Sequence, residues 1–489
     1  MPRHNILYKN VYHNLCTRIF ANEFDCCSHL PSMTELAEEY HVSLLTIHST
    51  FKLLQDVGLI HVTRGTEAEV LYRKSNPISI QKLHQWLADR LYTMSAVYHM
   101  AVRLTAHSVE YGARLCDDDE LQRLVDIADK ACCPDCPINR VAFYLIELYT
   151  ALISCTKNDL LLELLRAGDE YMSISMLLVV QDQALCEKYN ERARSFIKSI
   201  ISKIESKDFD SIACLVNNFS LGSLKLFEDY IKVTTSEFCP KQELLFKWTV
   251  FGNENLYSEI ANDLIMRISM GEFFDGERLP CEQKLQLQYG VSAKTIRIAL
   301  AALNECGIIK TVNGLGSVLT YLSSPPPAER YLPDAADGFN FFNSLQLIML
   351  NVPTMLRESF LFLTDEEIST TENCVNRLLG SKDKAYYVYG IILLDLTLRN
   401  GTEVLTNQVF RQLFTRIFLF RHKSKGYRDI FDRHFDACLP YITDALVQLK
   451  ARNVENYICD IKQILSLIAT STRQMCAVSA LHYDIPIPY

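Results

Sequence analysis

The sequence lacks several features that would each have indicated a class of protein. Its 49 lysine and arginine residues are outnumbered by 58 acidic residues, which gives a net charge of −9. Any nucleic acid must therefore be bound through local basic patches. No apolar run approaches the ~20 residues that span a bilayer, and the first residues have no apolar segment typical of a signal peptide. These absences favour a cytoplasmic protein without a membrane partner.

Signature motifs of common enzymes are missing as well. The sequence contains no Walker loop, no GxGxxG after a strand, no HExxH and no GxSxG. We therefore expect no enzymatic activity. The 17 cysteines are odd in number and scattered, whereas disulfide frameworks normally have even, closely spaced cysteines in a short chain. This pattern favours reduced thiols.

One dense cysteine group stands out, Cys132-Cys133-Pro134-Asp135-Cys136. A structural zinc site needs four ligands, and no second cysteine or histidine pair stands at a motif-like spacing. We interpret these cysteines as ordinary loop thiols, with a metal or redox site as the alternative, and we expect no metal and no cofactor.

An internal repeat organises the chain. At a constant offset of 249 residues, Leu30-Pro31 matches Leu279-Pro280, and Val42-Ser43 matches Val291-Ser292. Such a repeat over about sixty residues indicates a duplicated domain. Further matching pairs are Tyr8 and Tyr257, Arg18 and Arg267, Tyr40 and Tyr289, Gly58 and Gly307, and Gly65 and Gly314.

The repeated unit has the order helix, helix, tight turn, helix, β-hairpin. In the first copy, Ser32 and Glu35 form a capping-box pattern for the second helix, Ser43 opens the third helix, and Gly58 is suited to end it. Short β-type segments follow at 59–63 and 68–72. This order predicts a winged helix-turn-helix domain.

The segments between and after the two copies have apolar residues at helical spacing over residues 78–235 and 340–475. A proline-rich stretch, Ser323–Pro327, is typical of an extended linker. The predicted fold is mainly α with small β wings, in four parts. These are a winged helix-turn-helix domain at 1–75, an all-helical domain at 76–240, a second winged helix-turn-helix domain at 250–322 and a second all-helical domain at 330–489.

The faces of the third helix follow from its period of 100° per residue. In the first copy Ile47, Phe51 and Leu54 share one side and are expected in the core. The corresponding inward residues of the second copy are Ile296, Leu300 and Leu303. The residues expected to face outward are Leu45, His48, Ser49 and Lys52 in the first copy and Lys294, Arg297, Ile298 and Ala301 in the second.

Both copies resemble the DNA-binding domain of GntR-type bacterial transcription regulators. The matching residues include Leu30-Pro31-Ser32, Val42-Ser43, Thr46-Ile47, Gly58-Leu59-Ile60 and Arg64-Gly65, and in the second copy Leu279-Pro280, Val291-Ser292, Thr295-Ile296-Arg297, Gly307-Ile308-Ile309 and Asn313-Gly314. The resemblance implies that the third helix contacts bases and that the glycine wing tip enters the minor groove. The candidate DNA contacts are Ser43, Thr46, His48, Lys52, Arg64 and Gly65 in the first copy, and Lys284, Ser292, Lys294, Thr295, Arg297, Asn313 and Gly314 in the second.

The sequence departs from the family pattern. Family members usually carry an arginine early in the second helix, where this chain has Thr34 and Gln283, and another after the serine that opens the third helix, where it has Leu44 and Ala293. Residues 1–75 contain 7 basic and 8 acidic side chains. Since DNA affinity depends on phosphate neutralisation, we expect the second copy to be the stronger DNA binder.

The long helical segments resemble, at the level of pattern, the effector domains of the fatty-acid-regulator branch of the same family. Many such domains hold a metal with an aspartate and three histidines, but residues 140–235 contain no histidine. The resemblance implies an unidentified small-molecule effector, and we expect no such metal site.

These observations favour a sequence-specific transcription regulator that binds a double-stranded DNA operator and responds to a ligand. Because one chain has two binding domains, we expect an intramolecular pseudo-dimer, with a homodimer as the alternative. A second hypothesis is a protein-interaction scaffold whose winged helices have lost DNA affinity.

Overall fold

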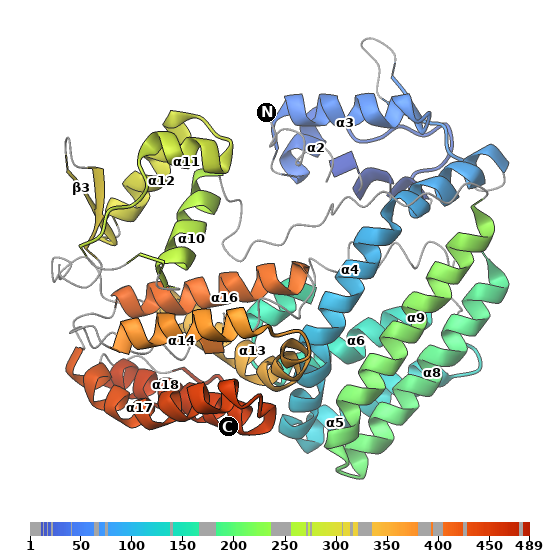
Figure 1. Ribbon diagram of the computed structural model, residues 1–489. Helices are drawn as coiled ribbons and strands as arrows, with labels where there is room; N and C mark the ends of the chain where they lie inside the picture. Colours follow the sequence, from blue (N-terminus) through green and yellow to red (C-terminus); the bar gives the residue numbers. More distant parts are fainter. Residues whose placement is uncertain are drawn as a thin grey trace. The chain divides into compact units, whose positions relative to one another are not determined.

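The computed structural model describes residues 11–12, 14–16, 18–20, 23–40, 42–62, 68–73, 77–136, 140–165, 182–235, 256–269, 272–273, 276–305, 307–312, 316–320, 335–379, 393–394, 404–423, 428–478 and 483–489. The chain divides into two compact units. Unit 1 consists of Met1–Leu152 and Leu164–Lys247, and unit 2 of Ile153–Glu163 and Trp248–Tyr489. Each unit contains one copy of the repeat and one group of long helices (Figure 1).

The repeated domains are here called head 1 and head 2. After helical residues within 11–20, head 1 contains α2 (Met33–Glu39), α3 (Leu44–Asp56), β1 (Ile60–His61) and β2 (Glu69–Val70). Head 2 contains α10 (Leu256–Ser269), α11 (Glu282–Tyr289), α12 (Ala293–Glu305), β3 (Ile309–Val312) and β4 (Gly316–Leu319). The strands of each head pair antiparallel. Both heads therefore have the predicted winged helix-turn-helix order.

The long helices are here called body 1 and body 2. Body 1 contains α4 (Pro77–Leu115), α5 (Asp118–Cys132), α6 (Val141–Ser154), α8 (Gln183–Glu205), the short 3₁₀ helix η2 (Phe209–Ser211) and α9 (Ile212–Thr234). Body 2 contains α13 (Ala335–Phe360), α14 (Asp365–Leu379), α16 (Val404–Lys423), α17 (Arg428–Lys450) and α18 (Val454–Val478). The predicted fold class is confirmed. The four domain boundaries stay a prediction, and the linker Ser323–Pro327 lies outside the described residues.

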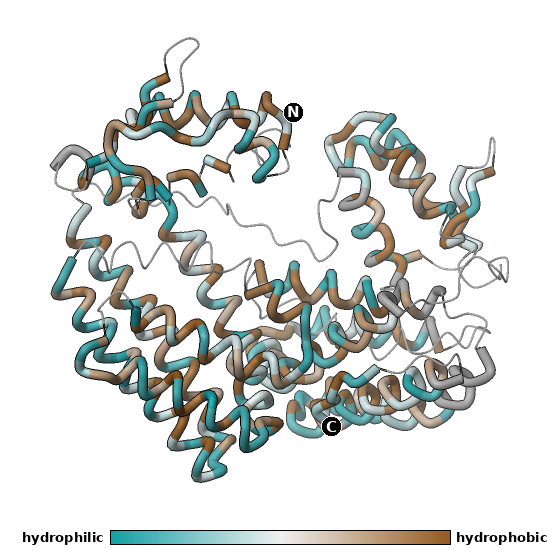
Figure 2. Tube along the Cα trace, turned by 180° about the vertical axis from the view of Figure 1, so that it is seen from behind, coloured by the Kyte–Doolittle hydropathy of each residue, from teal (hydrophilic) through white to brown (hydrophobic). Residues whose placement is uncertain are grey.

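The helices of each body bury one apolar face against their neighbours. In body 1, α4 packs along α9, and α8 packs against both α5 and α9. In body 2, α13 packs against α16 and α18, and α17 packs along α18. Apolar and polar residues alternate along the helices (Figure 2), as expected for helices that share a core on one side and face solvent on the other. Among the helices in the described ranges, none combines the length and the apolar character needed to cross a bilayer.

Local sequence signals set the boundaries of several elements. Ser32 and Glu35 form the predicted capping box at the start of α2. Gly58 follows α3 with a φ of 67°, a left-handed conformation in which glycine, lacking a Cβ atom, is not strained. Proline is tolerated in the first turn of a helix, and α4 begins at Pro77 directly after the wing.

Each head packs against the body in its own unit. In unit 1 the ring of Phe20 lies 5.1 Å from that of Tyr72 and 5.2 Å from that of Trp86 on α4. Lys82, also on α4, donates to the carbonyl oxygen of Gly58 at 3.0 Å. In unit 2, α10 packs against α16. Each body is therefore in direct contact with its head, and a conformational change in the body reaches the head through that contact.

Unit 2 includes a segment, Ile153–Glu163, that precedes the rest of the unit by about ninety residues. Asn158 is fully buried, and its side-chain amide donates to the Asn343 carbonyl at 3.0 Å and to the Gln346 side-chain oxygen at 2.7 Å. Its own side-chain oxygen accepts from the Leu161 amide at 3.0 Å. Gln346 in turn donates to the carbonyl of Thr156 at 2.9 Å. This polar network holds the segment in unit 2.

We expect Asn158→Ala to destabilise unit 2 by about 2–4 kcal/mol, because it leaves buried hydrogen-bonding groups without partners. The measurement is the free energy of unfolding from a denaturant titration. Asn218→Ala, on the exposed surface of α9, is the control and should change stability by less than about 0.5 kcal/mol. Equal effects of the two substitutions would contradict the structural role of Asn158.

Candidate nucleic-acid interface

The two heads share their interactions residue by residue at the offset of 249. In the hairpins, Ile60 pairs with Val70 and Ile309 with Leu319. An isolated bridge joins the loop before the second helix to the outer strand in both heads, through His29–Glu69 in head 1 and Arg278–Val318 in head 2. The two heads thus have the same backbone arrangement, and they differ in their surface side chains.

An arginine joins the first helix of each head to the second. In head 1 Arg18 pairs with Glu23 at 2.7 Å, donates to the Tyr40 hydroxyl at 3.0 Å and lies 5.0 Å from the ring centre of Phe24. The corresponding residues in head 2 are Arg267, Glu272, Tyr289 and Phe273. This cluster fixes the angle between the first helix and the helix-turn-helix formed by the second and third helices.

The tyrosine of this cluster also bonds the first helix directly. Tyr289 donates to the Asp263 carboxylate at 2.6 Å, and Tyr40 donates to the side-chain oxygen of Asn14. Burial, together with the hydrogen bond to Asp263, raises the pKa of Tyr289 well above its usual value. The phenol therefore stays neutral and keeps donating to the carboxylate.

The third helix of each head has the predicted orientation. Ile47, Phe51 and Leu54 of α3 are buried, and the residues at the corresponding positions of α12, Ile296, Leu300 and Leu303, are also buried. Leu45, His48 and Lys52 of α3 are exposed and Ser49 is half-buried, while Lys294, Arg297, Ile298 and Ala301 of α12 are exposed. Each head therefore presents the outward face that the sequence predicted.

The serine and threonine at the start of the third helix have a capping role. Ser43 accepts from the Thr46 amide at 3.2 Å, and the two hydroxyls lie 2.9 Å apart. Thr46 is only 2% exposed, so the structure does not support its predicted contact with bases. Ser292 and Thr295 form the same pair at 3.0 Å, with Ser292 exposed and Thr295 half-buried.

Head 2 presents cations on the outward face. Arg297 is 68% exposed along its side chain, and its Nε lies 2.9 Å from a carboxylate oxygen of Glu282, the first residue of α11. Lys284 on α11 and Lys294 on α12 are also exposed. The Glu282–Arg297 ion pair was not predicted from the sequence. Because the pair spans two helices, only the fold brings its members together.

Head 1 has apolar side chains at the same positions. Leu45 stands where head 2 has Lys294 and is 62% exposed, and Leu44 is 55% exposed. Met33, at the position of Glu282, is 36% exposed. His48 takes the position of Arg297 and is exposed. At these positions head 1 thus has less positive charge than head 2, and it exposes leucines where head 2 has Ala293 and Lys294.

The remaining candidate DNA contacts are at the two wing tips. Arg64 and Gly65 in head 1, and Asn313 and Gly314 in head 2, lie outside the described residues. The strands on either side of each tip are described, and the first strand of each hairpin, β1 or β3, follows the third helix of its head. The role of these four residues in DNA binding stays a prediction.

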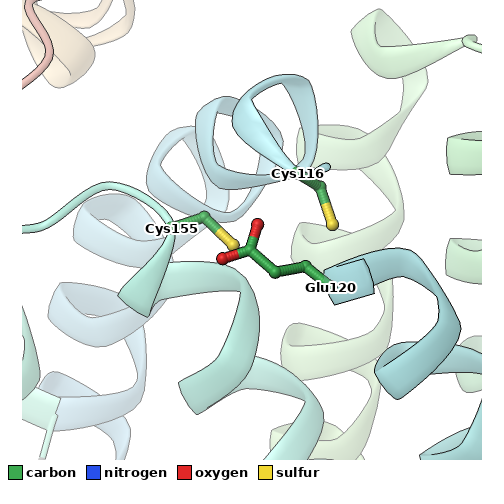
Figure 3. A group of neighbouring side chains, drawn as sticks. All are labelled: Cys116, Glu120 and Cys155. Atoms are coloured by element: carbon green, nitrogen blue, oxygen red, sulfur yellow. The ribbon is translucent and has the colours of Figure 1, made fainter. Parts of the chain in front are cut away.

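A separate polar group lies at the start of α5. Cys116, Glu120 and Cys155 point toward one another (Figure 3), and their ligand atoms lie within 4.8 Å of one another. The carboxylate of Glu120 also accepts from the Asp117 amide at 3.2 Å as part of a capping box. Capping of α5 therefore explains the position of this carboxylate, and the group is separate from the outward faces of the heads.

Comparison with known proteins identifies the repeated domain. The family described as bacterial regulatory proteins, gntR family, matches residues 7–70 and 256–319, two ranges that are again 249 residues apart. The chain carries the GntR-family helix-turn-helix domain twice. This confirms the resemblance inferred from the sequence.

Individual relatives match over one head. The transcriptional regulator SmoD of Agrobacterium fabrum is 32% identical over 74 residues, which are 15% of this chain and 32% of that protein. The mannosyl-D-glycerate transport/metabolism system repressor MngR of Escherichia coli is 39% identical over 66 residues, 14% of this chain and 28% of that protein. The chain thus spans about a third of the length of these curated relatives.

Among solved structures, the chain is similar to E. coli McbR/YncC, with 16% identity and a TM-score of 0.26 over 45% of this chain and 99% of that one. It is also similar to a GntR protein of Streptococcus agalactiae, with 16% identity and a TM-score of 0.23 over 44% of this chain and 99% of that one.

Proposed function

We propose that the protein is a DNA-binding transcription regulator in which head 2 supplies most of the affinity for the operator. The observation that carries this proposal is the exposed cationic face of head 2, formed by Lys284, Lys294 and Arg297. Cations at this face neutralise phosphates, and an arginine near the start of a recognition helix can bind guanine through two hydrogen bonds.

Arg297 is available for such contacts despite its ion pair. An ion pair between exposed side chains contributes only about 0–1 kcal/mol, so a phosphate or a guanine can replace Glu282 as the partner of Arg297 at little cost. Glu282 nevertheless opposes binding, because its carboxylate lies at the face that approaches the DNA. The pair therefore tunes affinity.

Head 1 has a different part in this proposal. Its outward face carries His48 and Lys52 but also the exposed side chains of Met33, Leu44 and Leu45. Leucine cannot neutralise phosphate, so head 1 adds little to affinity and reads a different half-site. The same apolar side chains favour a second candidate function, in which head 1 binds another protein and head 2 alone binds DNA.

The regulator acts as a single-chain pseudo-dimer in this proposal. Dimers of helix-turn-helix proteins normally bind two half-sites about one helical turn apart, and this chain contains two heads with different outward faces. Such a chain suits an asymmetric operator. A homodimer of the whole chain is the alternative arrangement.

Ligand response is assigned to body 2. Several side-chain oxygens on α13 and α16 are buried and have no hydrogen-bond partner among the described residues, namely those of Ser344, Asn351, Ser359 and Thr406. Buried polar groups are normally satisfied by protein, water or ligand. Ser344 and Ser359 lie about 22 Å apart along α13, so a small polar effector would be bound by a subset of these oxygens. An effector held between α13 and Thr406 of α16 would lie beside the helix against which α10 of head 2 packs.

The decisive experiment measures DNA binding by the full chain against salt concentration. Fragments from the promoter regions of the source genome are selected first, and the affinity for the best fragment is then measured between 50 and 200 mM salt. We expect log K to fall linearly with log salt, with a slope of about −0.9 for each phosphate neutralised. Sedimentation should give one chain per operator.

Failure to bind any fragment at low salt would contradict the proposed function and favour the scaffold hypothesis. Two chains bound to two similar half-sites would contradict the pseudo-dimer and leave the regulator proposal intact.

We expect Arg297→Ala to weaken operator binding by about 1–3 kcal/mol, or roughly 5- to 150-fold, because it removes a base or phosphate contact. The matched substitution in head 1, His48→Ala, should change affinity by no more than about twofold. Affinity is measured by fluorescence anisotropy. A larger loss in His48→Ala than in Arg297→Ala would show that head 1 is the principal DNA-binding head.

We expect Glu282→Gln to increase DNA affinity by up to about fivefold, because it frees Arg297 from an exposed ion pair worth at most about 1 kcal/mol. Glu305→Gln, at the far end of α12, is the control and should leave affinity unchanged. The gain should shrink in a variant that also carries Arg297→Ala. Weaker binding by Glu282→Gln would mean that Glu282 orients Arg297 for DNA and does not compete with it.

A further inference from the structure

Two adjacent cysteines lie together in the loop before α2 of head 1. The sulfur atoms of Cys26 and Cys27 are 3.6 Å apart. The guanidinium of Arg73, at the end of the wing, donates to Cys26 Sγ at 3.0 Å and reaches Cys27 Sγ at 3.9 Å. Cys27 is exposed and Cys26 half-buried. The fold thus brings a cation from a distant part of the head onto an accessible pair of thiols.

The repeat shows that the scaffold does not require these thiols. Cys27 has a φ of 68°, and at the corresponding position of head 2 stands Gly276, with a φ of 82°. A left-handed conformation is easily adopted by glycine and costs energy for cysteine. Head 1 therefore carries a cysteine where the backbone favours glycine, and Asp275 replaces Cys26 in head 2.

The contacts give the two thiols different chemistry. The hydrogen bond from Arg73 lowers the pKa of Cys26, whereas the hydrogen bond with Cys26 raises the pKa of Cys27. When one proton leaves the pair, the thiolate is therefore favoured on Cys26 over Cys27. Thiolates are the nucleophilic and metal-binding form of cysteine.

We propose that Cys26 and Cys27, with Arg73, form a dithiol site for a thiophilic centre that bonds two sulfurs at once, of the class of trivalent arsenicals. Trivalent arsenic is pyramidal and bonds two sulfurs at an angle not far above a right angle, so the two sulfurs must lie close together, as they do at 3.6 Å in head 1. The site is independent of the proposed DNA-binding function.

Other uses of the pair fit less well. Consecutive Cα atoms are about 3.8 Å apart, below the ~4.4 Å lower limit of ordinary disulfides, so oxidation to a disulfide is strained. Zinc normally takes four ligands. Among the described residues the pair belongs to no group of three metal-ligating side chains, and the positive charge of Arg73 opposes a divalent cation.

The reaction with a monosubstituted arsenical, R–As(OH)₂, involves no change of oxidation state. The Cys26 thiolate forms the first As–S bond and displaces hydroxide. Cys27 forms the second As–S bond, and its proton leaves with the second hydroxide as water. The products are the cyclic dithioarsenite, one water and one hydroxide.

Backbone hydrogen bonds join the loop that carries the thiols to the wing. The amide of Cys27 donates to the Val70 carbonyl at 2.9 Å, and the amide of Val70 donates to the Ser28 carbonyl at 2.9 Å. The loop that carries both thiols is therefore hydrogen-bonded along β2.

The test uses the full reduced chain with Cys132→Ser, Cys133→Ser and Cys155→Ser, which removes the other adjacent pair and the thiol nearest Cys116. Phenylarsine oxide is the probe, and intact mass spectrometry is the readout. We expect one phenylarsenic adduct per chain, mapped to the peptide that contains both thiols. Adding either Cys26→Ser or Cys27→Ser should abolish the adduct while the circular dichroism spectrum stays unchanged.

Arg73→Gln should slow adduct formation without changing its stoichiometry, whereas Arg278→Gln, an exposed arginine of head 2, should leave the rate unchanged. An adduct that persists in either cysteine variant, or its absence from the parent chain, would overturn the site. Conversion of the pair to a disulfide by peroxide in place of arsenical binding would overturn it equally. An unchanged rate in Arg73→Gln would overturn the role of the arginine.

Discussion

The contact between one arginine, a glutamate and a tyrosine holds the helix-turn-helix of each head in place. Arg18 in head 1 and Arg267 in head 2 emerge from the first helix and reach the tyrosine that ends the second helix. A small three-helix domain has little apolar core to fix the angle between its helices. Charge-assisted hydrogen bonds are directional as well as strong, so they supply the angle that burial alone does not.

With that angle fixed, the surface of the third helix is free to differ. The two heads share their hairpin register and their capping serines, yet one presents Lys294 and Arg297 and the other Leu45 and His48. Substitutions on an exposed face cost little stability. A duplicated domain can therefore keep its fold while its copies acquire different partners, and the exposed leucines of head 1 are tolerated because the core beneath them is unchanged.

The sequence alone predicted the scaffold well, because its signals are local or repeated. The capping box at Ser32, the buried stripe at Ile47 and the turn at Gly58 depend on residues a few positions apart. It failed where the fold brings distant residues together. The burial of Thr46, the Glu282–Arg297 ion pair and the inclusion of Asn158 in unit 2 each depend on tertiary packing. Aligning the two copies at the offset of 249 pairs Met33 with Glu282. It does not show that the carboxylate of Glu282 reaches Arg297.

The negative net charge of the chain is compatible with a DNA interface made of a few cations. A chain with a net charge of −9 repels DNA at long range, and salt screens this repulsion beyond about 8–10 Å. Contacts at the surface of head 2 act within that distance, so a few exposed cations can outweigh the overall charge. For the same reason a single carboxylate at the contact face, that of Glu282, matters more than many acidic residues on the bodies. In the proposed function, the position of charge relative to the third helix, and not its sum over the chain, then determines which head binds DNA.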